Sequence, residues 1–484
     1  MLSIAEIEKF ISEDETSEKK MQAAVGERYY EAEHDIKDCR FFYYNADGVL
    51  VEDKVRSNIK ISHPFFTILA DQLSAYMLSF EKNPIRAKEG VKGLQTHLDT
   101  YFDGEFWAEI GELITGAYSK GFEYIYGKRN DEDRLCFECA DSMGVVEVQA
   151  KYASDGKPHK IWHYVDIDLT EKGKRTVTKI QVWDEDGIHF YMKDSDTASI
   201  VRDESVEFNP RPHVVYVDEE TGKKTGKLFK FIPFWRLDNN RKQTSGLKPI
   251  KALIDDYDRH ACALTNNLTD FDTPLHVVRG FEGDDLEKLQ QNLKTKKMIG
   301  VEEGGGVDVQ TVDIPYQARR EKLEIDKEGI FTFGMGLNPS QVGDGNVTNV
   351  VIRSRYALLD LKANKLEDRL CSLLKKIIKI VLEEINEKYE TDYQITDTYF
   401  EFTRAITTNE SENIANEMVK ANTRQIEITT ILNVAASIGD KKAIQLICEA
   451  LDIDYEEIEK EFEKAKEQSL ETAKEELERV LTDE

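Results

Sequence analysis

The chain has 484 residues, and its 65 Lys and Arg residues stand against 93 Asp and Glu residues, which gives a formal net charge of −28 at pH 7. This length is enough for two or three hydrophobic cores, or for one elongated body. The charge argues against a protein that wraps nucleic acid in basic surface. An acidic channel, in contrast, would repel phosphate and let a duplex slide through it.

Two further features bear on the cellular compartment. No segment approaches the roughly 20 apolar residues that a membrane span needs, and the N-terminus lacks a basic-then-apolar signal pattern. Six cysteines in so long a chain do not form the dense pattern of a disulfide framework. We therefore expect synthesis in the cytosol and no membrane partner.

The first 121 residues are predicted to be mainly helical. A helix is expected over residues 17 to 38, followed by a loop that leads to the apolar residues of 58 to 61. A second helix is predicted from Pro64 to residue 80, because proline suits the first helical turn. A third is predicted from residue 94 to 120 and ends at Gly121.

The next region changes to a strand pattern. Short apolar runs recur there, each bounded by Gly, Asp, Lys or Pro, and the links between them are short. Short links indicate antiparallel hairpins, so the fold class is predicted to be α+β. The runs cover residues 122–126, 145–152, 159–167, 176–183, 188–192 and 213–217.

Two helices with a small region between them are predicted next. The first helix covers residues 247 to 271 and the second covers 316 to 333. The intervening residues contain a short helix at 284 to 294, a strand at 297 to 301 and a glycine loop at 304 to 306. This order predicts a two-helix stalk with a small α/β tip.

One very long helix is predicted from residue 350 to 389. A seven-residue apolar repeat begins at Ile352 and holds for about four heptads without a proline. At about 1.5 Å per residue the helix is roughly 60 Å long. In the second half of the helix, further apolar residues widen its apolar face, which predicts burial between two layers there. These residues are Leu374, Ile378, Val381, Leu382 and Ile385.

The C-terminal part is predicted to contain a strand and further helices. Residues 399 to 403 alternate as a strand does. Asn409 with Glu412, and Asp454 with Glu457, fit helix-capping boxes.

Several short patterns occur in an order that resembles the portal proteins of long-tailed phages, over roughly residues 20 to 470. They are Tyr29-Tyr30 through His34-Asp35-Ile36; Asn58 with the helix that ends between Tyr76 and Asn83-Pro84-Ile85; Gly116-Ala117 through Gly121 to Tyr124; and Ile232-Pro233 through Asn239-Asn240 to the run from Leu253 to Asp258.

The resemblance implies an elongated portal-type subunit in a ring, usually of twelve copies, at one vertex of a capsid. The ring would conduct double-stranded DNA during packaging and ejection, hold it weakly, and dock the terminase large subunit and a head-tail adaptor protein. Major capsid and scaffold proteins are further implied partners. The implied parts are an α/β wing (1–245), a stem helix (246–273), a small α/β clip (274–315), a second stem helix (316–337), a tunnel loop (338–349), a long wing-crossing helix with a returning wing strand (350–408) and a helical crown with a C-terminal tail (409–484).

The resemblance also implies which residues of the chain contact DNA. The DNA-facing tunnel loop would comprise Gln341, Val342, Gly343, Asp344, Gly345, Asn346, Val347, Thr348 and Asn349. Such proteins often carry Ser-Gly where Thr348-Asn349 stands here. Stem phosphate contacts are expected from Lys248, Lys251 and Arg259. The alternatives are that these side chains are solvated helix surface or form ion pairs with Asp255, Asp256 and Asp258.

Enzyme chemistry is weakly supported. The stretch from Asp166 through Asp168 to Thr170 matches the Asp-x-Asp-x-Thr loop of magnesium-dependent haloacid-dehalogenase-like phosphatases, in which the first aspartate is the nucleophile. That fold needs a parallel sheet, whereas this region has the pattern of hairpins. Cys136 and Cys139 lack a second pair at zinc-site spacing.

We therefore expect a non-enzymatic protein without cofactor or metal. A rod-like scaffold protein built on the long helix remains the other alternative, and it predicts open polymers instead of closed rings.

Overall fold

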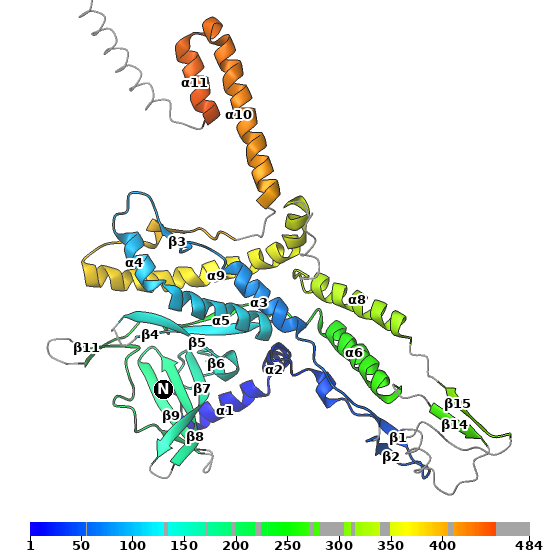
Figure 1. The fold of residues 1–484 in the computed structure, drawn as a ribbon. Helices are drawn as coiled ribbons and strands as arrows, with labels where there is room; N and C mark the ends of the chain where they lie inside the picture. Colours follow the sequence, from blue (N-terminus) through cyan, green and yellow to red (C-terminus); the bar gives the residue numbers. More distant parts are fainter. Residues whose placement is uncertain are drawn as a thin grey trace, which may run out of the picture. The chain divides into compact units, whose positions relative to one another are not determined.

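The computed structural model of the chain forms two compact units (Figure 1). The first contains residues 1–343 and 355–405, and the second contains 344–354 and 406–484. The structure describes residues 1–54, 56–129, 134–170, 173–194, 199–217, 224–229, 231–271, 275–279, 304–310, 315–338, 349–404 and 410–451. Within these residues, no helix has both the length and the apolar character needed to cross a bilayer.

The N-terminal helices differ from the prediction. Helix α1 (Ile4–Glu15) was not predicted, although Ser3 and Glu6 form a capping box at its start and Ile7 is wholly buried. Helix α2 (Glu18–Tyr30) begins near the predicted residue but ends eight residues early, since Ala32 adopts a left-handed φ of 58°. A short 3-10 turn, η1 (Asp35–Asp38), follows. The predicted single helix over 17 to 38 is therefore wrong.

The predicted helix over 94 to 120 is also two helices. Helix α4 (Leu94–Tyr101) stops at Phe102, and α5 (Gly104–Lys120) begins with the Asp103 side chain accepting a 3.1 Å hydrogen bond from the Phe106 amide. The aspartate cap starts a new helix. Helix α3 (Phe65–Met77) follows Pro64, as predicted.

The strands form small antiparallel sheets, which confirms the predicted α+β class and hairpin connections. One sheet has the order β10-β9-β8-β7-β6, and a second has the order β13-β4-β5. Four further sheets have two strands each: β1-β2, β11-β12, β14-β15 and β16-β3. The strands are β1 (Phe42–Tyr44), β2 (Leu50–Glu52), β3 (Ile85–Ala87), β4 (Phe122–Arg129), β5 (Leu135–Ala140), β6 (Val145–Val148), β7 (His159–Thr170), β8 (Gly173–Asp184), β9 (Gly187–Asp194), β10 (Ile200–Arg202), β11 (Val214–Val217), β12 (Lys224–Lys227), β13 (Phe234–Asp238), β14 (Leu275–Arg279), β15 (Gly306–Gln310) and β16 (Thr398–Phe400).

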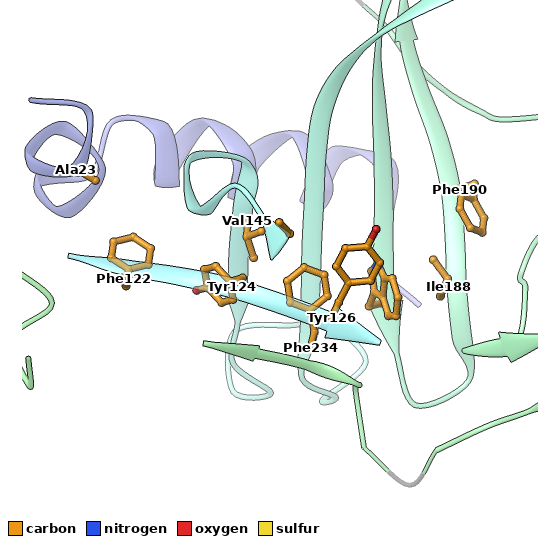
Figure 2. Close-up of a cluster of buried hydrophobic side chains, with 10 residues drawn as sticks. Ala23, Phe122, Tyr124, Tyr126, Val145, Ile188, Phe190 and Phe234 are labelled. Atoms are coloured by element: carbon orange, nitrogen blue, oxygen red, sulfur yellow. The ribbon is translucent and has the colours of Figure 1, made fainter. Parts of the chain in front are cut away.

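An aromatic core joins the two larger sheets (Figure 2). Tyr126 of β4 stacks on Phe234 of β13 with ring centroids 5.4 Å apart, and Trp183 of β8 meets Tyr126 edge-on at 5.7 Å. Ala23 of α2 belongs to the same buried cluster. Offset and edge-on ring contacts of this kind add to the energy of burial, so the cluster ties both sheets to α2.

Helices α6, α8 and α9 agree closely with the prediction. Helix α6 (Lys251–Phe271) begins four residues later than expected, because residues 246 to 250 form a turn. Helices α8 (Tyr316–Phe333) and α9 (Asn349–Tyr389) have the predicted bounds within one residue. Each residue predicted to widen the apolar face of α9 is buried: Leu374, Ile378, Val381, Leu382 and Ile385.

Two glycines allow α2 and α5 to meet closely. A Cβ atom on Gly26 of α2 would lie 2.0 Å from the carbonyl oxygen of Ser119 in α5. Gly121, which ends α5, has a φ of +99°, and a Cβ there would lie 2.4 Å from the carbonyl oxygen of Gln243. Three chain segments therefore lie in close backbone contact here: α2, α5 and the segment that contains Gln243. This place is called the glycine joint below.

The second unit contains a helical hairpin. Helix α10 (Glu410–Ile438) and helix α11 (Asp440–Leu451) are separated by Gly439, whose φ is +85°. The predicted cap at Asn409, the predicted cap at Asp454, and the elements predicted at 284–294 and 297–301 lie outside the described residues.

Candidate functional site

Helices α6 and α8 pack against each other and form the pair predicted from the sequence (Figure 1). Lys322 of α8 donates 2.5 Å hydrogen bonds to Asp256 of α6 and to Asp326 of α8. Leu253 of α6 lies against Gly329 of α8, where a Cβ atom would be 3.3 Å from the leucine methyl group. An ion pair and a close apolar contact thus join the two helices.

An extended segment, residues 57–63, runs antiparallel to α6 and is called the strap below. Ser57, Ile59 and Ile61 donate their amides to side chains of α6: Asp270 at 3.3 Å, Asn266 at 2.7 Å and the Cys262 sulfur at 3.2 Å. Asn266 and Cys262 also donate back to the carbonyls of Ile59 and Ile61. These two α6 side chains therefore act as strand partners for the strap.

The spacing of the strap contacts follows from helix and strand geometry. The acceptors on α6 recur every fourth residue, which is about 6 Å along a helix. The donors on the strap recur every second residue, which is about 6.6 Å in an extended chain. The two rises nearly match, so four successive contacts form without a break.

The fourth contact is a buried aspartate at the end of the strap. Asp258 is fully buried; its Oδ1 lies 2.7 Å from Nδ1 of His63 and accepts the His63 amide at 3.0 Å. Its Oδ2 lies 2.6 Å from Nδ1 of His34, which stacks on Tyr29. Burial alone would raise the pKa of Asp258, but the contacts with His34 and His63 outweigh it and hold the pKa below its ordinary value.

Of the three predicted phosphate contacts, Lys251 is engaged within the chain. Its Nζ lies 2.6 Å from Asp35 and 2.8 Å from Asp255, and 4.8 Å from the ring centroid of Tyr29. Burial would lower the pKa of Lys251, yet the hydrogen bonds that Lys251 donates to Asp255 and Asp35 raise it overall. Lys248 lies in the turn before α6 and Arg259 lies on α6, and both side chains are exposed.

The chain on either side of the predicted tunnel loop is fixed at several points. Gln72 of α3 exchanges two hydrogen bonds with the backbone of Leu337, at 2.8 and 3.1 Å. Lys362 of α9 donates to the carbonyl of Gly334 at 3.0 Å and lies 4.5 Å from the ring centroid of Tyr118. Burial lowers the pKa of Lys362 to about 7.

The tunnel-loop residues themselves fall mainly outside the described part of the chain. Residues 341 to 348 are not described, and Asn349 is the first residue of α9. The structure therefore describes both flanks of the loop, at residues 334–338 and from 349 onward.

The phosphatase alternative is contradicted by the sheet. Asp166 lies within β7 opposite Val177 of β8, in an antiparallel pair that continues beyond Asp168. The alternative requires the first aspartate at the end of a parallel strand, with helices on both faces of the sheet. Among the described residues, no group of three or more His, Cys, Asp or Glu side chains is placed to hold a metal ion.

The strap was missed by the sequence analysis, which predicted a loop that leads to residues 58 to 61 and assigned no long-range contact to His34 or His63. Residues 42–44 and 50–52 form the hairpin β1-β2 instead, and both histidines reach Asp258, about two hundred residues away. A signal was present in the sequence: α6 carries Asp258, Cys262, Asn266 and Asp270 at a spacing of four, a polar row along one helix face.

The chain is similar to known phage portal proteins over most of its length. A family model described as "Phage portal protein, SPP1 Gp6-like" matches residues 9–475. The portal protein of Bacillus phage SPP1 is 27% identical over 397 residues, covering 80% of this chain and 75% of that protein. The portal protein of Clostridium phage phiCD119 is 24% identical over 406 residues, covering 78% and 84%. A chain in the solved "Neck of empty GTA particle computed with C6 symmetry" has a TM-score of 0.33 at 14% identity, covering 61% of this chain and 72% of that one.

Proposed function

The chain belongs to the SPP1 Gp6-like family of phage portal proteins, and we propose that twelve copies of it close into a ring at one vertex of a phage capsid. Double-stranded DNA passes through this ring during packaging and again during ejection. The protein resides in the virion, after a period in the host cytoplasm before assembly. The observation that carries the proposal is the family match, which extends over nearly the whole chain.

The charge of the chain supports a conduit that holds DNA weakly. Each phosphate contact made by a Lys or Arg side chain releases counterions and adds affinity, so a channel with many such contacts would retain the duplex. The chain has 93 acidic residues against 65 Lys and Arg residues, and its net charge of −28 repels phosphate and so favours weak retention of the duplex. Lys251 is also paired with Asp35 and Asp255, which leaves Lys248 and Arg259 as the exposed cations of the α6 region.

The parts of the subunit are assigned as follows. The packed helices α6 and α8 support a stem at residues 246–273 and 316–337, with the clip at 274–315 between them. The hydrogen bonds that Gln72 donates to Leu337 and Lys362 donates to Gly334 support a tunnel loop at 338–349 whose flanking residues are held in place. The wing is assigned to 1–245, its long helix and returning strand to 350–408, and the crown with its tail to 409–484.

The partners follow from these assignments. The clip docks the terminase large subunit during packaging and the head-tail adaptor protein afterwards, and the wing meets major capsid and scaffold proteins. ATP hydrolysis belongs to the terminase, so the portal subunit itself is a non-enzymatic docking platform.

Mass photometry and electron microscopy of the purified protein test the ring. A closed ring with twelve times the mass of the 55.6 kDa chain is the expected result. Rods or open polymers would instead support the scaffold alternative, and a stable monomer, including inside assembled heads, would overturn the proposal.

A shortened loop tests the tunnel assignment separately. Deleting the three residues from Gly343 to Gly345 should leave ring assembly intact and change DNA packaging or retention, measured as the DNA content of filled heads. Failure of the deletion variant to form rings would show that the segment is structural and that the loop is wrongly assigned.

A further inference from the structure

The hairpin β1-β2 is a regular two-stranded element. Tyr43 pairs with Val51 and Tyr44 pairs with Leu50 across the antiparallel strands. The Asn45 side chain accepts hydrogen bonds from the amides of Asp47 and Val49 at 3.1 and 2.8 Å, and Gly48 adopts a φ of +74° in the turn. The sequence therefore specifies this hairpin locally, with the turn chemistry that its register requires.

The hairpin exposes large apolar side chains on both faces. Because successive side chains of a strand point to opposite faces, Tyr44 and Leu50 lie on one face, and Tyr43 and Val51 lie on the other. The exposed fractions are 54% for Phe42, 51% for Tyr43, 73% for Tyr44, 56% for Val49, 54% for Leu50 and 37% for Val51.

The exposed apolar area is large for a single hairpin. Three aromatic side chains of about 150–250 Å² each and three aliphatic ones, at these exposures, present on the order of 500 Å². The largest apolar patch on a typical monomer is about 300–600 Å² and is often functional. A standard protein interface buries about 800 Å² on each partner, so a neighbour that covers both faces of the hairpin would bury more than half of one side.

The two chain segments that flank the hairpin contact each other, and the strap attaches the second of them to α6. Arg56 lies 4.3 Å from the ring centroid of Phe41, and Asn58 donates a 3.1 Å hydrogen bond to the carbonyl of Cys39. The strap then binds the following residues along α6. An isolated two-stranded hairpin is marginally stable in water, and the exposed apolar side chains of this one form no core of their own.

We propose that the β1-β2 hairpin packs against the neighbouring copy of this chain in the ring. This inference rests on the proposed function. A ring that closes by rotation is built from head-to-tail contacts, which require two different patches on every copy. Helix α8 exposes Ile325 and Phe333, at 65% and 61%, and so offers apolar side chains on a second surface of the same chain. Each copy thus presents one hairpin and one surface to receive it.

A paired substitution tests the hairpin. Tyr44→Ser with Leu50→Ser removes one cross-strand apolar pair while keeping the turn. The matched control is Val165→Ser with Ile167→Ser on β7, where the side chains are similarly exposed at 71% and 58%. In mass photometry at equal concentration, the hairpin variant should lose ring population by about tenfold or more, as when an interface anchor is removed. The control should assemble as the wild type does, and far-UV circular dichroism should be unchanged in both variants.

A photo-crosslinker identifies what covers the hairpin. Benzoylphenylalanine in place of Tyr44 should yield covalent pairs of chains in purified rings, whereas the same group in place of Val165 should yield few. Crosslinks confined to one chain, or full ring assembly by the hairpin variant, would overturn the inference alone. A wild-type chain that forms no rings would overturn the proposed function, and the inference with it.

Discussion

The C-terminal half of α9 and helix α6 are both long helices of the same unit, but they are held by different chemistry. From Leu366 to Ile385, α9 buries mainly aliphatic side chains, with Glu384 as its polar anchor. Glu384 accepts hydrogen bonds from Tyr101 at 2.9 Å and from Arg129 at 2.9 Å. Helix α6 buries Ile254, Asp258, Cys262 and Asn266, and the last three bind the strap.

The difference shows two ways of fixing a helix. Apolar packing is non-directional, so a helix such as α9 tolerates small shifts and swaps of similar volume. The polar row of α6 fixes the register of the strap, because a slip of one residue turns every bonded amide away from its acceptor. We therefore expect α9 to respond to lost volume and α6 to respond to lost hydrogen bonds.

The largest effect is expected in α9. Ile378→Ala should lower the free energy of unfolding by about 2–5 kcal/mol, because Ile378 is wholly buried and the substitution leaves a cavity. Urea unfolding followed by circular dichroism measures this change. Leu361→Ala, on the same helix at 48% exposure, is the control and should change little. Equal effects of the two substitutions would contradict the description of α9 as a helix held by buried aliphatic side chains.

The next effect is expected at Asp258. Asp258→Ala should cost about 3 kcal/mol, because the donors of His34 and His63 lose a buried acceptor. Asp270→Ala removes only the exposed 3.3 Å contact at the other end of the strap and should cost less than about 0.5 kcal/mol. The same unfolding measurement compares them, and a larger loss for Asp270→Ala would reverse the predicted gradient.

A smaller, local effect is expected at Asn266. Asn266→Ala should cost about 1–3 kcal/mol, since the amide and carbonyl of Ile59 both lose their partner. Hydrogen–deuterium exchange should quicken in residues 57–63 before it changes elsewhere. Thr269→Ala, an exposed neighbour on α6, should leave the exchange of the strap as it is; unchanged protection in the Asn266 variant would mean that the strap is held by other contacts.

The smallest effect at neutral pH is expected at Lys362, which joins α9 to the end of α8. Its pKa falls from 10.5 to about 7 on burial, so between pH 7 and 10.5 the unfolded chain binds more protons than the folded one. Stability contributed by this lysine should therefore rise with pH across that window. The melting temperature should therefore increase from pH 7 to pH 9.5 in the wild type and in the control Lys365→Met, whose side chain is exposed. The increase should be smaller in Lys362→Met. An equal increase in all three proteins would contradict the lowered pKa of Lys362.

The parts that could be predicted from the sequence are those in which local periodicity agrees with tertiary burial. The heptads of α9 and the apolar spacing of α8 determine where these helices begin and end within one residue. The breaks at Ala32 and at Asp103 were missed because apolar spacing continues across both. Asp103 is a good N-cap residue, so that break was open to detection, whereas a left-handed alanine has no sequence signature.

The candidate site was less predictable, because its contacts are between distant parts of the chain. Nothing near Ile59 indicates that its backbone will bind Asn266, and Lys251 has the same local sequence whether it meets phosphate or Asp35. The polar row of α6 could have indicated a partner, although it could not have identified the strap. Hydrogen bonds between a backbone and remote side chains leave no periodic trace in either segment.

The glycine joint of α2 and α5 has a consequence for sequence variation. At Gly26 even a methyl group would overlap the Ser119 carbonyl, and at Gly121 the left-handed backbone adds to the same obstacle. In a saturation mutagenesis screen, alanine should therefore be as damaging as tryptophan at these two sites. Whether a substitution is tolerated at these two sites would depend only on whether it adds a side-chain atom. The hydropathy and size of the new residue would not predict the outcome.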